Sequence, residues 1–135
     1  MAHEISEKFV AALNELESNG DFEKIVALFA DDAEINNVVT IENSHDLNAK
    51  EFWTKYRENF GDVKSEFNNK IHGENSSALE WTTKGTNADG GEIEYEGVSI
   101  LEVENDKITR FFAYFNPSKL GEQINGKTAA KSKEA

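Results

Sequence analysis

Residues 9–37 have the sequence FVAALNELESNGDFEKIVALFADDAEINN, which predicts two amphipathic helices, a sharp break between them and the start of a strand. In both helices apolar residues recur at helical spacing and so form one buried stripe. The stripe residues are Ile5, Phe9, Leu13 and Leu16 in the first helix, and Phe22, Ile25, Val26 and Phe29 in the second. Asp21 is suited to cap the second helix, because its carboxylate can accept from unpaired amides of the first turn. We expect Asp31 and Asp32 to end that helix and residues 33–39 to form a strand.

A third helix and four further strands are expected after this stretch. Asn48 and Glu51 have the spacing of a capping box, with Asn in the place of Ser or Thr, and Gly61 is placed to end the helix in a left-handed conformation. The strand-like segments, which are separated by turn signals, are residues 63–73, 78–87, 92–104 and 107–116. Helices followed by such a meander predict an α+β fold, with the helices gathered on one face of a curved sheet.

Length and composition favour one acidic domain. The chain has 135 residues, of which 38% are hydrophobic, and a net charge of -12, which argues against a nucleic-acid partner. No apolar run is long enough to span a membrane and no export leader is seen, so we expect a cytoplasmic protein without a membrane partner. The absence of cysteine excludes disulfides and thiolate metal ligands. We expect residues 1–120 to form the domain and residues 121–135, which are small and charged, to form a flexible tail.

Side-chain alternation assigns each strand an inner face, toward the helices, and an outer face. It points Trp81, Tyr95 and Ser99 inward. In the last strand both faces are largely apolar, so both must be covered, and a second copy of the chain is the simplest cover for the outer side. The sequence therefore predicts a two-fold homodimer through a sheet face formed by Val98, Ile100, Phe111 and Phe115.

Three segments together resemble the nuclear transport factor 2-like superfamily, and within it SnoaL-like and ketosteroid-isomerase-like domains. They are FVAALN at residues 9–14, IVALFADDAEINN at residues 25–37 and GVSILEVENDKITRFFAYFNP at residues 97–117. The resemblance covers roughly residues 5–122. It implies a cone-shaped roll, in which a strongly curved mixed or antiparallel sheet wraps around three N-terminal helices. The open end of such a cone is a pocket for an apolar ligand, and these domains are commonly dimeric.

The resemblance also implies where catalytic groups should stand, and this chain lacks them. Asn37 occupies the place of the carboxylate base of ketosteroid isomerases, Phe9 that of the phenol, and Ser99 that of the protonated carboxylic acid. In the SnoaL-like cyclases that this chain resembles, an acid/base Asp occupies the position of Asn116. The Asp-Arg-Asp cluster of limonene-epoxide-hydrolase-like proteins is also not found in the sequence. We therefore expect a pocket edged by neutral groups, without dienol-type isomerisation by that mechanism.

The predicted pocket combines flat aromatic surface with amides and hydroxyls that need partners when buried. Its expected lining residues are Asn37, Trp53, Tyr56, Trp81, Asn87, Tyr95, Ser99, Phe112, Tyr114 and Asn116. The candidate proton donors or acceptors are Tyr114, Tyr56 and His45, and the last of these lies beside Asp46 in a loop at the mouth of the cone. Core packing and solvated loop positions are the alternatives. Arg110, on the Tyr114 face, either binds an anionic group or forms a salt bridge.

No metal and no cofactor are predicted. The three histidines, His3, His45 and His72, are scattered along the sequence without His-x-His or His-Glu-x-x-His spacing, and alternation places His72 on the outer face.

Two functions from different classes remain open at this point. The first is a SnoaL-like protein that binds a small apolar or aromatic molecule and isomerises, cyclises or dehydrates it, or only binds it. The second is a non-catalytic homodimeric adaptor of the same fold with a vestigial pocket. An inner space of about 300 Å³ or more, edged by Asn and Tyr, favours binding. A space filled by Trp53, Trp81 and Phe112 favours the adaptor.

Overall fold

The computed structural model describes residues 2–37, 48–87 and 89–116. The predictions for His45 and for the tail at residues 121–135 lie outside these ranges. In chain order the elements are α1 (Ala2–Asn19), α2 (Glu23–Ala27), β1 (Phe29–Asn37), α4 (Ala49–Glu58), β2 (Phe60–His72), β3 (Ser76–Asn87), β4 (Glu92–Glu104) and β5 (Lys107–Phe115).

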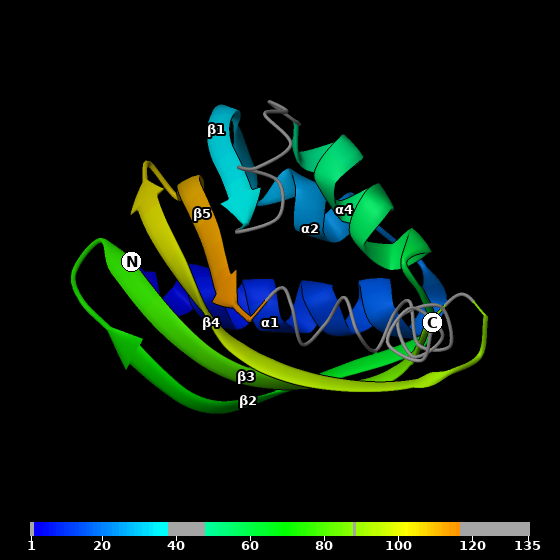
Figure 1. Ribbon diagram of the computed structural model, residues 1–135. Coiled ribbons are helices and arrows are strands. Elements are labelled where there is room, and N and C mark those ends of the chain that lie inside the picture. The colour runs from blue at the N-terminus through cyan, green and yellow to red at the C-terminus, as the bar shows by residue number, and fades with distance from the viewer. Residues whose placement is uncertain (1, 38–47, 88, 117–135) are drawn as a thin grey trace.

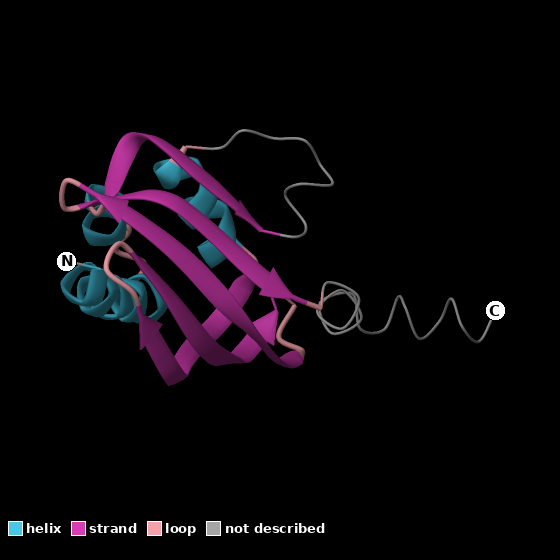
Figure 2. Cartoon of the chain, turned by 90° about the vertical axis from the view of Figure 1, so that its left-hand side faces the viewer, coloured by secondary structure: helices cyan, strands magenta, loops and turns pink. Residues whose placement is uncertain are grey.

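The five strands form one mixed sheet in the order β1-β5-β4-β3-β2. β1 runs parallel to β5, and the other neighbours are antiparallel. The sheet curls around α1, with β2 and β3 on one side of this helix and β1 and β5 on the other (Figure 1). The view turned by 90° shows the helices gathered on the concave side of the curved strands (Figure 2). The predicted α+β fold is therefore confirmed.

The helix signals in the sequence are largely satisfied. α1 buries the expected stripe against the inner face of the sheet. The capping box of α4 is present: the Asn48 side chain accepts from the Glu51 amide at 2.8 Å, and the Glu51 carboxylate accepts from the Asn48 amide at 3.3 Å. Asp21 accepts from the Glu23 amide at 3.0 Å as expected, but the N-cap residue of α2 is Phe22, so Asp21 makes this bond from one residue before the cap.

Two predicted helix ends are wrong. α2 stops at Ala27 and β1 begins at Phe29, which pairs with Ile108 of β5, so the long-range pairing overrides the helical spacing of Phe29. Gly61 lies within β2 and does not have a positive φ. A Cβ at this position would lie 2.7 Å from the Thr86 hydroxyl oxygen, so any other residue would force the Thr86 side chain to move.

Strand β5 contains one extra residue, Thr109, between the pairs Ile108↔Val103 and Arg110↔Glu102. A single-residue bulge moves every later side chain to the opposite face. The structure therefore corrects the prediction for this strand as follows: Phe111 and Phe115 point inward, and Phe112 and Tyr114 point outward beside Ile100 and Val98.

Strand β2 carries a similar extra residue, Asn68, between the pairs Phe67↔Trp81 and Asn69↔Glu80. Beyond this bulge His72 pairs with Ser77, which is buried on the inner face. The prediction that His72 faces outward is therefore wrong, and the side chain lies on the side of the sheet that holds α1.

Two apolar clusters fill the inner side of the sheet. The larger one joins the helices to β1, β3, β4 and β5, and the smaller one consists of Phe60, Val63, Trp81, Ile93 and Tyr95. Tyr56, Phe67 and Phe115 pack against both. Within the described ranges, none of the helices combines the length and the hydropathy that a membrane crossing requires.

Candidate functional site

A carboxylate lies in the interior of the cone. Glu17, near the end of α1, is only 4% exposed. It follows Leu13 by four residues and therefore shares the buried stripe of the helix. The expectation of a wholly neutral interior, based on Asn37 and Ser99, is thus wrong.

Three hydrogen bonds hold this carboxylate. Glu17 Oε1 accepts from the Ser65 backbone amide at 2.8 Å, and Oε2 accepts from the Ser65 hydroxyl at 2.6 Å and from the Tyr56 hydroxyl at 2.7 Å. The residues come from three elements, α1, β2 and α4. Because β2 is an edge strand, some of its amides have no strand partner. Glu17 supplies the missing acceptor for one of them and so ties α1 to the free edge of the sheet.

The network continues across the sheet. Ser65 Oγ and Thr83 Oγ1 are 2.7 Å apart, and because Ser65 donates to the carboxylate, Thr83 donates to Ser65. Thr83 pairs across the sheet with Tyr95 on β4. We call Glu17, Tyr56, Ser65, Thr83 and Tyr95 the Glu17 cluster.

Both phenols of the Glu17 cluster remain protonated at neutral pH. Burial is the main reason that the pKa of Tyr56 lies well above its usual value, and the charges of Tyr95 and Glu17 raise it further. Burial likewise raises the pKa of Tyr95, with a further contribution from the charge of Glu17. The cluster therefore combines a buried hydrogen-bond acceptor with phenols that act as donors.

An aromatic wall adjoins the Glu17 cluster. The ring of Trp81 meets that of Tyr95 edge to face, with centroids 5.2 Å apart, and Phe115 lies 5.4 Å from Tyr95. Trp81 Nε1 donates to the Ser99 hydroxyl at 2.9 Å. The structure thus brings together four of the predicted pocket residues, Tyr56, Trp81, Tyr95 and Ser99, on the inner face.

The remaining predicted pocket residues lie elsewhere. Trp53 packs among aromatic rings of the larger apolar cluster, and its indole N–H has no partner within the described ranges. The Asn87 side chain accepts from the Asp89 and Gly91 amides in the β3–β4 turn. Asn37 is half-buried at the end of β1, Asn116 is exposed after β5, and Phe112 and Tyr114 face outward. Of the two candidate proton donors within the described ranges, Tyr56 belongs to the Glu17 cluster and Tyr114 does not.

A groove with a volume of about 670 Å³ runs between α1 and β2. Its lining has three apolar groups, Val10, Val63 and Phe67. The polar and charged groups are Asn14, Glu17, Ser18, Lys64, Ser65, Glu66 and Lys70. The volume exceeds the minimum expected of a ligand site. Among the described residues, none of those predicted from the sequence lines this groove, because side-chain alternation favours the centre of the sheet over its edge.

The outer face of the sheet carries an apolar patch. We call Val98, Ile100, Phe112 and Tyr114 the outer patch; they adjoin one another across β4 and β5. Tyr114 is 44% exposed, and its ring covers that of Phe112 at 4.4 Å. The outer patch replaces the predicted surface, since Phe111 and Phe115 belong to the interior.

Arg110 borders the outer patch and does not reach the interior. Its guanidinium pairs with Glu34 at 3.1 Å and with Glu102 at 3.2 Å. Of the two alternatives for this residue, the salt bridge is the one that the structure contains.

The chain belongs to the family of SnoaL-like domains, whose model matches residues 7–111. No curated protein sequence matches it significantly.

Solved structures share its fold at low sequence identity. TerC, co-crystallised with polyporic acid, is 17% identical over 93% of this chain and 98% of its own, with a TM-score of 0.77. A nuclear transport factor 2-like (NTF2-like) protein from Anabaena variabilis is 18% identical over 88% and 92%, with a TM-score of 0.76. An epoxide hydrolase of M. tuberculosis, described as LEH-like, is 16% identical over 98% of both chains, with a TM-score of 0.67. These likenesses confirm the NTF2-like, SnoaL-like fold.

Proposed function

We propose that this protein binds a small, largely apolar organic molecule and that Glu17 holds the polar group of that molecule. The observation that carries the proposal is a carboxylate, 4% exposed, at the wall of a groove of about 670 Å³. The proposed binding unit is the single domain of residues 1–120, acting in the cytoplasm.

The hydrogen bonding of Glu17 leaves room for a ligand. A carboxylate has about four acceptor positions, and the described residues use three, one on Oε1 and two on Oε2. A hydroxyl or N–H of a ligand in the groove can take the remaining position on Oε1. Val10, Val63 and Phe67 offer apolar contact to the rest of such a molecule.

The same geometry supports proton transfer. The Glu17 carboxylate accepts and the Tyr56 phenol donates, 2.7 Å apart in a water-poor setting. Such a pair suits an isomerase, cyclase or dehydratase, in which a base removes a proton and an acid returns one. Asn37 and Ser99 replace the carboxyl groups that ketosteroid isomerases carry on the sheet. The acid and the base of a reaction in this chain would therefore be the helix residues Tyr56 and Glu17.

The comparisons support a small-molecule ligand in general terms. TerC was co-crystallised with polyporic acid, and proteins of the same fold are described as an LEH-like epoxide hydrolase and a putative hydroxylase. Polyporic acid is therefore a reasonable first probe for this chain.

A thermal-shift screen tests the proposal with polyporic acid, steroids, flavonoids, terpenes and fatty acids. A compound present at about a hundred times its Kd should raise the melting temperature by roughly 8 °C, since it binds only the folded state. We expect Glu17→Gln to lose most of that shift and Glu4→Gln, at an exposed position of the same helix, to keep it. A shift of equal size in Glu17→Gln would refute the role of this carboxylate.

We also propose that the outer patch joins two copies of the chain. The alternative function, a non-catalytic homodimeric adaptor, requires such a dimer. Ile100→Lys should convert a dimer to a monomer in size-exclusion chromatography with light scattering, because a buried, unpaired charge opposes association. Ile71→Lys, at a 60% exposed position of β2, is the matched control. A monomeric wild type contradicts the dimer. A dimer that no ligand stabilises favours the adaptor over the binding protein.

A further inference from the structure

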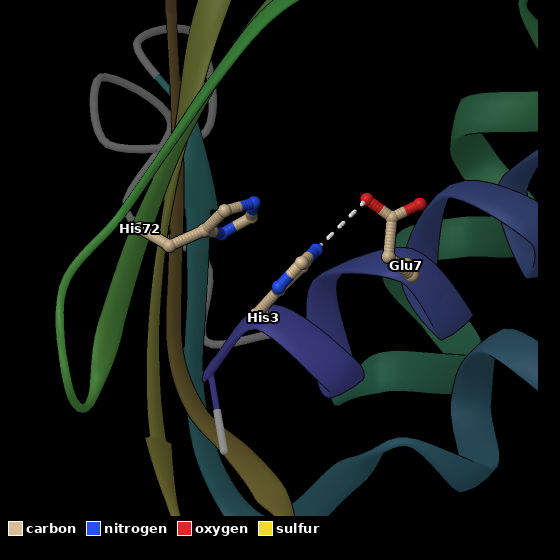
Figure 3. A group of neighbouring side chains, drawn as sticks. All are labelled: His3, Glu7 and His72. Atoms are coloured by element: carbon tan, nitrogen blue, oxygen red, sulfur yellow. Dashed lines mark ion pairs between the residues drawn. The ribbon is translucent and has the colours of Figure 1, made fainter.

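Two of the three histidines meet at the end of the molecule opposite to Glu17. His3 lies in the first turn of α1, Glu7 one turn later, and His72 at the last position of β2 (Figure 3). One ligand atom from each side chain lies within 4.8 Å of the other two. The two imidazole rings are stacked with centroids 4.4 Å apart, and His3 Nε2 lies 3.7 Å from Glu7 Oε1.

We propose that His3, Glu7 and His72 form a binding site for a divalent transition-metal ion of the Zn²⁺ type. Two imidazole nitrogens and a carboxylate oxygen are a donor set that Zn²⁺ accepts, and a water molecule would complete a tetrahedron. Metal–ligand bonds of about 2.0–2.1 Å place donor atoms roughly 3.4 Å apart. The donor atoms, which lie up to 4.8 Å apart, must therefore close in by up to about 1.4 Å, and the side chains of His3 and Glu7 are exposed enough to move.

Neighbouring groups contact two of the ligands. His72 Nδ1 lies 2.7 Å from the hydroxyl of Ser77, a residue that is 3% exposed. If Nδ1 carries the proton and donates it to Ser77, the lone pair of Nε2 is left for the ion, as is usual for metal-binding histidines. Lys70 Nζ donates to both oxygens of Glu7, at 3.2 and 3.3 Å, so an ion would have to displace this ammonium from one of the two oxygens.

This site lies away from Glu17, although Lys70, which pairs with Glu7, also lines the groove. Glu17 lies fourteen positions after His3 in α1, which corresponds to about 21 Å along the helix axis. An ion at His3, Glu7 and His72 would connect the first turns of α1 to the end of β2. There the Ala2 amide already contacts the Glu74 carbonyl at 3.5 Å, so the ion would reinforce an existing junction.

Calorimetric titration of ZnCl₂ into untagged, metal-free protein tests the proposal. A short neutral extension before Met1 should be present in every variant, because a free terminal amine near His3 is itself a metal ligand. We expect one ion per chain. His3→Gln and His72→Gln should each weaken binding by well over tenfold, Ser77→Ala by roughly tenfold, and His45→Gln, which removes the remaining histidine, should leave it unchanged.

Nitrogen chemical shifts of the imidazoles provide a second readout. Saturation with Zn²⁺ should show His72 ligated through Nε2 with Nδ1 protonated, and circular dichroism should show that each variant is folded. Absence of stoichiometric binding by the wild-type chain would overturn the proposal. Binding that His72→Gln leaves intact would also overturn it, since the ion would then be held by α1 alone.

Discussion

Replacement of Glu17 is the most informative perturbation of this structure, because one side chain connects α1, α4 and the edge strand β2. Two substitutions separate its roles. Glu17→Ala removes every acceptor, whereas Glu17→Gln keeps the shape of the side chain and one carbonyl oxygen. The two variants should therefore differ strongly in stability.

The expected losses follow from the hydrogen bonds. In Glu17→Ala the Ser65 amide and the Tyr56 hydroxyl lose their acceptor in the interior, at about 1–3 kcal/mol each. Relief from burying a charged group offsets part of this cost, so we expect a net loss of about 3 kcal/mol in the free energy of unfolding.

Glu17→Gln should cost about 1 kcal/mol or less. Its oxygen can accept from the Ser65 amide, and its NH₂ group can donate to the Ser65 and Tyr56 hydroxyls, both of which are able to accept. No buried polar group is then left without a partner, although charge-assisted bonds become neutral ones.

Equilibrium unfolding in urea, followed by far-ultraviolet circular dichroism, measures both values. Glu4→Gln is the matched control on the same helix and should stay within about 0.5 kcal/mol of the wild type. A Glu17→Ala protein as stable as the wild type would refute the buried network. A Glu17→Gln protein as unstable as Glu17→Ala would show that the charge, and not the set of acceptors, stabilises this junction.

Three further predictions concern stability. Burial raises the pKa values of Tyr56 and Tyr95, so the folded state keeps protons that the unfolded state releases near pH 10. The stabilising effect of these two tyrosines is complete below that pH. Above it, each tyrosine should lower the free energy of unfolding, measured in urea, by about 1.4 kcal/mol per pH unit. Tyr56→Phe or Tyr95→Phe should therefore make the decline with pH less steep. Gly97→Ala should lower stability by about 2 kcal/mol or more in the same assay, because its Cβ would collide with the carbonyl oxygen of Tyr114. Asn48→Ala should cost about 1 kcal/mol by removing the cap of α4, and an unchanged melting temperature would contradict that assignment.

Most of the fold is predictable from the sequence because its signals are local. The stripe of α1, the capping box at Asn48 and the turn at Asn105 and Asp106 each depend on residues a few positions apart. The end of α2 was mispredicted for the opposite reason. Phe29 continues the helical spacing, but its pairing with Ile108 of β5 draws it into the sheet.

The facing of side chains could not be predicted beyond the two bulges. Alternation carries no mark of an extra residue when both faces of a strand are apolar, and β5 is such a strand. Thr109 therefore reversed the predicted positions of Phe111 and Phe112, and Asn68 reversed that of His72. One of these bulges decides which surface is free to meet a second copy, and the other brings His72 to α1. Both proposals thus depend on pairing registers that only the folded sheet determines.

Glu17 was missed although the sequence contains its signal. A glutamate four residues after Leu13 continues the apolar stripe of α1, and a buried carboxylate is expensive unless donors surround it. The helix supplies none of those donors; Ser65 and Tyr56 come from elements about forty to fifty residues later. An edge strand always has amides without strand partners. An acidic residue in the buried stripe of an adjacent helix can therefore be expected to accept a hydrogen bond from one of them. The bond to the edge-strand amide accounts for the contribution of Glu17 to stability. A ligand would use the remaining acceptor position on Oε1. Stability and binding measured together on Glu17→Gln therefore distinguish a carboxylate that only closes the edge of the sheet from one that also serves the groove.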